Sequence, residues 1–210
     1  MNERATNGAA GGEVAQNGPQ GFFLDVLLFL SVMFAVRAIH LPVVGFLGNG
    51  IFWSCTALCI AMWRMRARGF AWSDLGLRRP ESIRGAIVAT VFILALVPIA
   101  IIVFELAKDQ LPFVVAPDTS NEEAVSKFGD LRGNWYLFLS IIALVWIESM
   151  LEELLDRGFL INWLERTFAR VSFATVLAVL LQAAIFGFRH SYDLSSRSFT
   201  VGLIGLVMGI

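Results

Sequence analysis

A short acidic stretch interrupts an apolar part of the chain. Residues 148–160 read "ESMLEELLDRGFL" and directly follow the apolar run "WYLFLSIIALVWI". In a membrane, each charged side chain near the bilayer centre costs on the order of 2.5–3.5 kcal/mol. Burial favours the proton-bound form of a carboxyl group, so a buried glutamate can take and return a proton near neutral pH. The stretch therefore predicts a helix that turns a reactive face towards a polar, hydrated interior.

The spacing of the charged residues fits one face of an α-helix. Successive residues turn by about 100°, so Glu148, Glu152 and Asp156 form a narrow stripe. Glu153 and Arg157 form a second pair, four residues apart, beside it. Glu153 with Arg157 has the spacing of a structural ion pair. Glu152, in the middle of the stripe, is the strongest candidate for a functional carboxylate.

A candidate partner for Glu152 lies at the end of the next apolar run. The segment "AAIFGFRHSYDL" ends in His190, and a polar turn near Thr167–Ser172 separates the two runs. Glu152 lies about 17 residues before the middle of that turn and His190 about 20 after it, so an antiparallel hairpin places them within about 5 Å in height. Gly187, one turn before His190, would let a neighbouring helix approach closely. We therefore predict that a carboxylate and an imidazole face each other.

These residues match two motifs of a known family. The pattern EExxxR at Glu152, Glu153 and Arg157, followed by FxxxH at Phe186 and His190, resembles the CAAX prenyl endopeptidase and bacteriocin-processing (CPBP) family of intramembrane proteases. The segment "WSDLGLRRP" is similar to the juxtamembrane segment of many bacterial members. The resemblance extends over about residues 70–210.

The resemblance implies an intramembrane endopeptidase that hydrolyses a peptide bond of a membrane-associated or lipidated substrate. It assigns Glu152 to the activation of the attacking water, and His190 to binding water, metal or the oxyanion. Glu153 and Arg157 would orient the site. Glu152 and His190 are also the candidate ligands of a divalent metal such as zinc. Whether metal or glutamate-activated water dominates stays open.

Three features depart from the family pattern. Its third motif, HxxxN or HxxxD on a later helix, is absent after His190, and a typical zinc site takes three protein ligands. Asp156 stands where an aromatic residue is usual, and Arg189 stands where an apolar one is usual. We expect the chain to be a member shortened before its third motif, and inactive in that form. Two alternatives remain: a non-catalytic bacteriocin-immunity or scaffold membrane protein, and a small proton-coupled transporter.

The composition of the whole chain is that of an integral membrane protein. Of 210 residues, 57% are hydrophobic and 16% are charged, against roughly 45–50% and about 25% in soluble domains. A formal net charge of −1 gives no sign of a nucleic-acid partner. The expected partners are the lipid bilayer and a peptide or lipidated protein substrate.

The apolar runs predict an all-α, polytopic helical bundle. A membrane span needs about 20 mostly apolar residues. Six segments qualify, and the last is still apolar at the end of the chain: 22–41, 46–63, 85–106, 135–156, 172–190 and 199–210. We expect a disordered tail over residues 1–20, two membrane helices over 21–66, and a CPBP-like core over 67–210. Arginines cluster after the second run, so the N-terminus is predicted to be cytoplasmic in a multi-pass protein of the cell membrane.

Overall fold

The computed structural model describes residues 18–110, 128–192 and 195–209. Most of the predicted tail and the residues 111–127 lie outside these ranges. The described parts are built from helices, and they contain no strand. The prediction of an all-α membrane bundle is confirmed.

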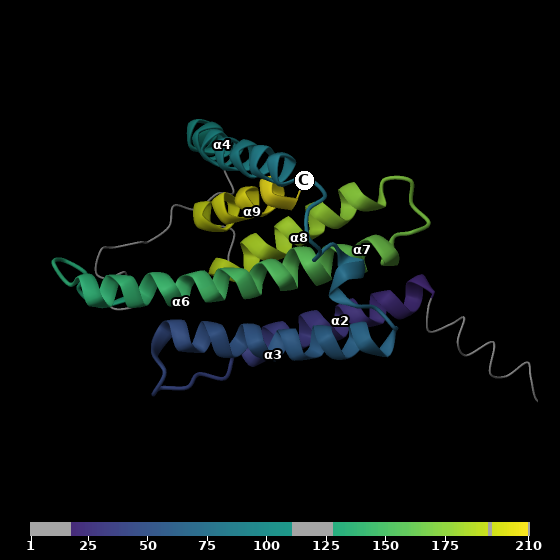
Figure 1. The fold of residues 1–210 in the computed structure, drawn as a ribbon, viewed down its shortest axis with the longest axis horizontal. Helices are drawn as coiled ribbons and strands as arrows, with labels where there is room; N and C mark the ends of the chain where they lie inside the picture. The colour runs from purple at the N-terminus through teal and green to yellow at the C-terminus, as the bar shows by residue number, and fades with distance from the viewer. Residues whose placement is uncertain (1–17, 111–127, 193–194, 210) are drawn as a thin grey trace, which may run out of the picture. The chain divides into compact units, whose positions relative to one another are not determined.

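The helices follow the apolar runs of the sequence closely (Figure 1). Two short 3₁₀ turns, η1 and η2, flank the third long helix, and a π-helical segment, η3, continues the helix that carries the acidic stretch. In chain order the elements are α2 (Pro19–Val36), α3 (Gly45–Ala67), η1 (Trp72–Leu75), α4 (Ile83–Ala107), η2 (Lys108–Gln110), α6 (Trp135–Glu153), η3 (Leu154–Ile161), α7 (Asn162–Thr167), α8 (Ala174–Ser191) and α9 (Ser196–Gly209).

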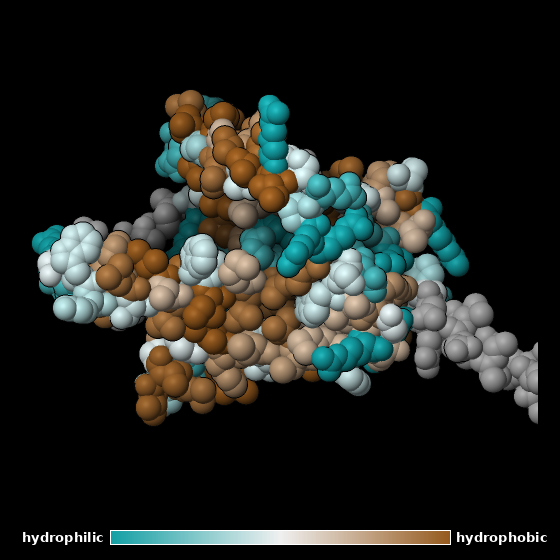
Figure 2. All heavy atoms as spheres, in the orientation of Figure 1, coloured by the Kyte–Doolittle hydropathy of each residue, from teal (hydrophilic) through white to brown (hydrophobic). Residues whose placement is uncertain are grey.

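Four described helices are long and apolar enough to cross a membrane: Pro19–Val36, Gly45–Ala67, Ile83–Gln110 and Ala174–Ser191. Two of the six predicted spans differ. α6 carries glutamates in its last two turns, and α9 has 14 residues. Figure 2 shows apolar side chains covering the visible face of α4, most of which is exposed. Such faces suit lipid, because their side chains are apolar and most backbone hydrogen bonds are made within the helix. The protein is a multi-pass membrane protein.

The described chain forms two compact units, the first being Met1–Gly76 with Trp146–Ala178. In this unit α2 packs against α3 and α7, and α3 packs against η3. Its core is aromatic: Phe29 and Phe159 are fully buried, with ring centroids 5.0 Å apart. η1 also reaches η3, where a Cβ at Gly158 would lie 3.2 Å from the Trp72 ring. The first unit therefore holds the acidic stretch on a scaffold made by the N-terminal helices.

The second unit, Leu77–Val145 with Val179–Ile210, is held together partly by small residues. α4 packs against α9, where Phe104 and Phe199 stack at 6.1 Å. α8 and α9 touch backbone to backbone: a Cβ on Gly187 would overlap the Ser198 carbonyl oxygen and lie 3.0 Å from the Gly202 Cα. The close approach predicted at Gly187 is thus present, and α9 is the helix that makes it.

Candidate functional site

The C-terminal end of α6 turns its carboxylates inward. Glu148 and Glu152 are half-buried, whereas Ile147 and Met150 are more than half exposed. Residues four apart share a face of an α-helix, so both glutamates lie on one inward face, as the stripe predicted. Their neighbours on the outward face are suited to lipid.

The prediction of a uniform α-helix through the acidic stretch is wrong from residue 154 onward. Leu154–Ile161 is π-helical, with Glu153 as the last residue of α6. A π-turn has more residues per turn than an α-turn, so the 100° spacing no longer holds beyond Glu153. Asp156 lies within this segment and is fully buried. π-Helical segments are frequent at functional sites.

An ion pair spans the junction between α6 and η3. Arg157 Nη1 donates to Glu153 Oε1 over 2.6 Å, and the Arg157 side chain is 15% exposed. The expected pairing of the second glutamate with the arginine is therefore present. The pair restrains Glu153, and Glu152 is the adjacent carboxylate on the inward face of α6. The roles assigned to Glu152, Glu153 and Arg157 in catalysis stay predictions.

His190 lies at the end of α8, with its ring oriented by the preceding turn. Its Nδ1 is 2.7 Å from the Phe186 carbonyl oxygen, and the two rings meet edge to face at 4.6 Å. A carbonyl oxygen can only accept, so Nδ1 carries the proton, and Nε2 is the nitrogen that can act as an acceptor. Arg189 is buried, with its guanidinium 5.1 Å from the centre of the Phe186 ring. The aromatic face stabilises a cation at this position.

Glu152 belongs to the first compact unit and His190 to the second, so their approach stays a prediction. The described residues offer few grouped side chains that could bind a metal ion. Within the residues that the structure describes, no three His, Cys, Asp or Glu side chains form a group that could hold a metal ion. A zinc site normally takes three protein ligands. The described residues therefore do not fit a complete zinc site.

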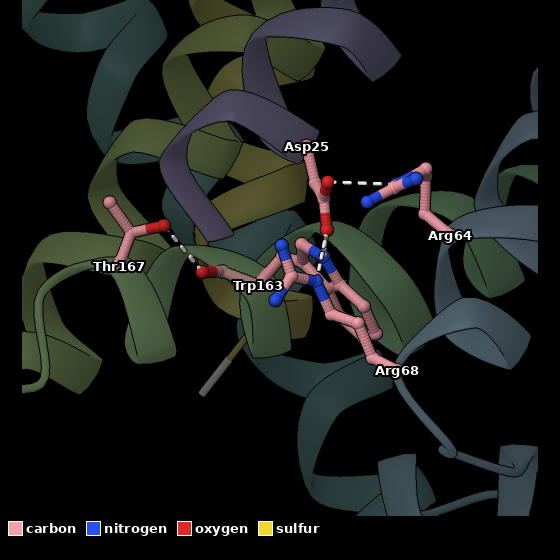
Figure 3. Close-up of polar contacts among 5 residues, drawn as sticks. All are labelled: Asp25, Arg64, Arg68, Trp163 and Thr167. Atoms are coloured by element: carbon pink, nitrogen blue, oxygen red, sulfur yellow. Dashed lines mark hydrogen bonds and ion pairs between the residues drawn. The ribbon is translucent and has the colours of Figure 1, made fainter. Parts of the chain in front are cut away.

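A second charged cluster escaped the sequence analysis. Asp25 on α2 is buried and accepts from Arg64 Nε at 2.8 Å, from Arg68 Nε, and from Trp163 Nε1 at 3.1 Å (Figure 3). Thr167 donates to the Trp163 carbonyl at 2.8 Å. The cluster joins α2, α3 and α7. The sequence did contain a sign of this cluster, since Asp25 is the single carboxylate in the apolar run "FFLDVLLFL". An unpaired carboxylate is costly in such a run, so a buried cationic partner was to be expected.

Aromatic rings enclose this cluster. Trp163 stacks on Phe159 at 4.3 Å and meets Phe22 and Phe70 edge to face. The Arg68 guanidinium lies 4.4 Å from the centre of the Phe22 ring, and that of Arg166 lies 4.2 Å from the Phe70 ring. Cations over aromatic faces are stabilised by the ring quadrupole. We interpret the Asp25 cluster as a clamp that holds α2 and α3 against the helix carrying the acidic stretch.

The comparisons with known proteins agree with the two motifs. A family model described as "Type II CAAX prenyl endopeptidase Rce1-like" matches residues 134–210. The match contains α6, η3, α7, α8 and α9, and thus both motifs, although it begins later than the resemblance expected from residue 70. Comparisons with curated proteins and with solved structures found no match. Through residues 134–210, this multi-pass membrane protein matches the Rce1-like family of type II CAAX prenyl endopeptidases, which confirms the family resemblance.

Proposed function

We propose that this protein is an intramembrane endopeptidase in which Glu152 activates water to hydrolyse a peptide bond. The family match supports a CAAX-type intramembrane protease and favours it over the scaffold and transporter alternatives. One observation carries the catalytic assignment: Glu152, the first glutamate of the EExxxR motif, is half-buried on the inward face of α6, directly before the π-helical segment. The inward position of Glu152 and its place in the matched motif make it the candidate base.

The proposed reaction uses the carboxylate as a proton carrier. Glu152 takes a proton from water as the water oxygen bonds to the peptide carbonyl carbon. The C–N bond then breaks, and Glu152 returns the proton to the amine, so that one water is added across the peptide bond. In the neutral ring of His190, Nε2 can accept a hydrogen bond from the same water. Because Nδ1 donates to the Phe186 carbonyl, the single proton of the neutral ring is already in use. Donation from Nε2 to an oxyanion would need a second proton and hence a charged ring, so the contact supports the water-orienting role.

The second unit offers a place for the apolar part of a substrate. A groove of about 400 Å³ lies between α8 and α9, on the helix that carries His190. Its lining includes Leu180, Ala184, Phe188, Phe199, Leu203 and Leu206. An aliphatic chain would bury apolar surface there. The groove supports a lipidated or membrane-inserted protein substrate. A divalent metal bound by His190 and a carboxylate stays a separate proposal, to be tested by chelation.

Cleavage of a lipidated reporter peptide by the full-length protein in detergent micelles or vesicles tests the proposal. Glu152→Gln keeps the shape of the side chain and removes the base, so we expect at least a ~10²-fold loss of kcat. Glu165→Gln on α7 is the matched control and should cleave like the wild type. The chain has two histidines, so His40→Ala controls for His190→Ala. Cleavage by Glu152→Gln at the wild-type rate would contradict the proposal.

A further inference from the structure

Glu148 lies against α3 at a point where a glycine leaves room for its carboxylate. A Cβ on Gly50 would overlap this carboxylate and lie 2.6 Å from its Cδ. Gly50 is within α3 and is not among the glycines with positive φ. The backbone therefore does not require glycine there, and glycine inside a helix is less favourable than alanine. The glycine at position 50 instead leaves space that the Glu148 carboxylate occupies.

The direction of Glu148 sets it apart from its neighbours on α6. Trp146, Ile147 and Met150 are all more than half exposed, whereas Glu148 is half-buried. α3 around this point presents Asn49, which is fully buried and holds the Leu41 and Gly45 backbone. The carboxylate thus lies against the α3 backbone at Gly50, next to this buried asparagine in the sequence.

The backbone of α6 links the positions of Glu148 and Glu152. Both lie in α6, which is α-helical through Glu153, so their Cβ atoms are about 5–6 Å apart on one face. A rotation of α6 about its own axis would shift both carboxylates by the same angle. A Glu148 side chain that packs against Gly50 would oppose that rotation and so keep the direction in which Glu152 points.

We propose that Glu148 is a positioning residue for Glu152, with its carboxylate lying against α3 in the space that Gly50 leaves. The inference rests on the proposed function, because it needs Glu152 to act on the water. It also gives the N-terminal helices a part in catalysis, since α3 lies outside the segment 134–210 that matches the family model.

Three variants test the inference through kcat and KM on the lipidated reporter: Gly50→Ala, Glu148→Ala and their combination. We expect each single change to lower kcat by ~10-fold or more with little change in KM, because a misplacement of about 1 Å can cost up to ~10²-fold. The double variant should be no slower than Glu148→Ala alone, since the new methyl group then meets no carboxylate. Gly85→Ala is the matched control, because a Cβ there meets Ser82 at an ordinary 3.5 Å.

The conservative variant Glu148→Gln separates positioning from proton transfer. It keeps the shape that fills the space that Gly50 leaves, so we expect kcat within ~3-fold of the wild type, whereas Glu148→Ala loses activity. Single effects that multiply in the double variant, or equal losses in Glu148→Gln and Glu148→Ala, would overturn the inference. If Glu148→Ala kept the wild-type kcat while Glu152→Gln was inactive, the inference would also be overturned. The proposed function would stand in that case. No cleavage by the wild type would instead contradict the proposed function itself.

Discussion

Arg157 donates to Glu153 over 2.6 Å across the point where α6 passes into the π-helical η3. The Arg157 side chain is 15% exposed and that of Glu153 is 37% exposed, so water screens the pair only in part. The bond holds one carboxylate of the EExxxR motif and fixes the junction beside Glu152. The stability of this junction bears directly on the direction of the proposed base.

Replacing Arg157 should therefore weaken both stability and cleavage. Arg157→Ala leaves Glu153 without its ion-pair partner in a half-buried position, and we expect a loss of about 1–2 kcal/mol in the free energy of unfolding. Thermal unfolding in detergent and reporter cleavage measure the two effects. Arg170→Ala, at an exposed position, is the control. Wild-type stability and cleavage in Arg157→Ala would show that the pair is dispensable.

The Asp25 cluster should be a major source of stability. Asp25→Ala leaves Arg64 and Arg68 in a buried setting without this carboxylate, and we expect a loss of about 3–5 kcal/mol. Asp109→Ala, which removes an exposed carboxylate, should change the unfolding temperature little. An Asp25→Ala variant as stable as Asp109→Ala would contradict the interpretation of the cluster as a clamp.

The indole of Trp163 should contribute separately from its ring stacking. Trp163→Phe removes the 3.1 Å hydrogen bond to Asp25 and keeps an aromatic ring for contact with Phe159. A hydrogen bond to a charged group contributes about 1.5–3 kcal/mol, which is the loss we expect. Combined with Asp25→Ala, the losses should be less than additive, because both variants break the same bond. Additive losses would mean that the bond contributes nothing.

The close contact of α8 and α9 predicts an order among glycine substitutions. A Cβ at Gly187 would meet the Ser198 carbonyl and Gly202 backbone, which cannot move without shifting a helix, and we expect a loss of about 1–3 kcal/mol. A Cβ at Gly202 would meet the Ala183 oxygen at 3.3 Å, so Gly202→Ala should cost less. Gly85→Ala should be neutral. Equal unfolding temperatures for the Gly187 and Gly85 variants would contradict the contact.

The sequence predicted the helices well, because long apolar runs bounded by charges and turns allow few alternatives in a membrane. The expected span 85–106 is α4, Ile83–Ala107, and 46–63 is α3, Gly45–Ala67. The expected turn Thr167–Ser172 falls between α7 and α8. The π-helical segment was missed, because hydrophobic periodicity carries no clear sign of a π-turn.

The candidate site was predictable only in its local parts. The Glu153–Arg157 pair follows from four-residue spacing on one helix. The contacts of Glu148 with Gly50, and of Asp25 with Trp163, join residues about 100 or more positions apart and depend on tertiary packing, which one sequence does not reveal. The inner and outer faces of α6 also needed the structure, because apolar residues can face either lipid or protein.

Thiol cross-linking tests most directly whether Glu152 and His190 face each other. Cys55 and Cys59 are first replaced by serine, and cysteines are then placed at 152 and 190, or at 147 and 190 as the control. Ile147 points away from Glu152 on α6. A short bifunctional thiol reagent should link the 152–190 pair in membranes and leave the 147–190 pair unlinked. Linkage of 147–190 without linkage of 152–190 would contradict the proposed site.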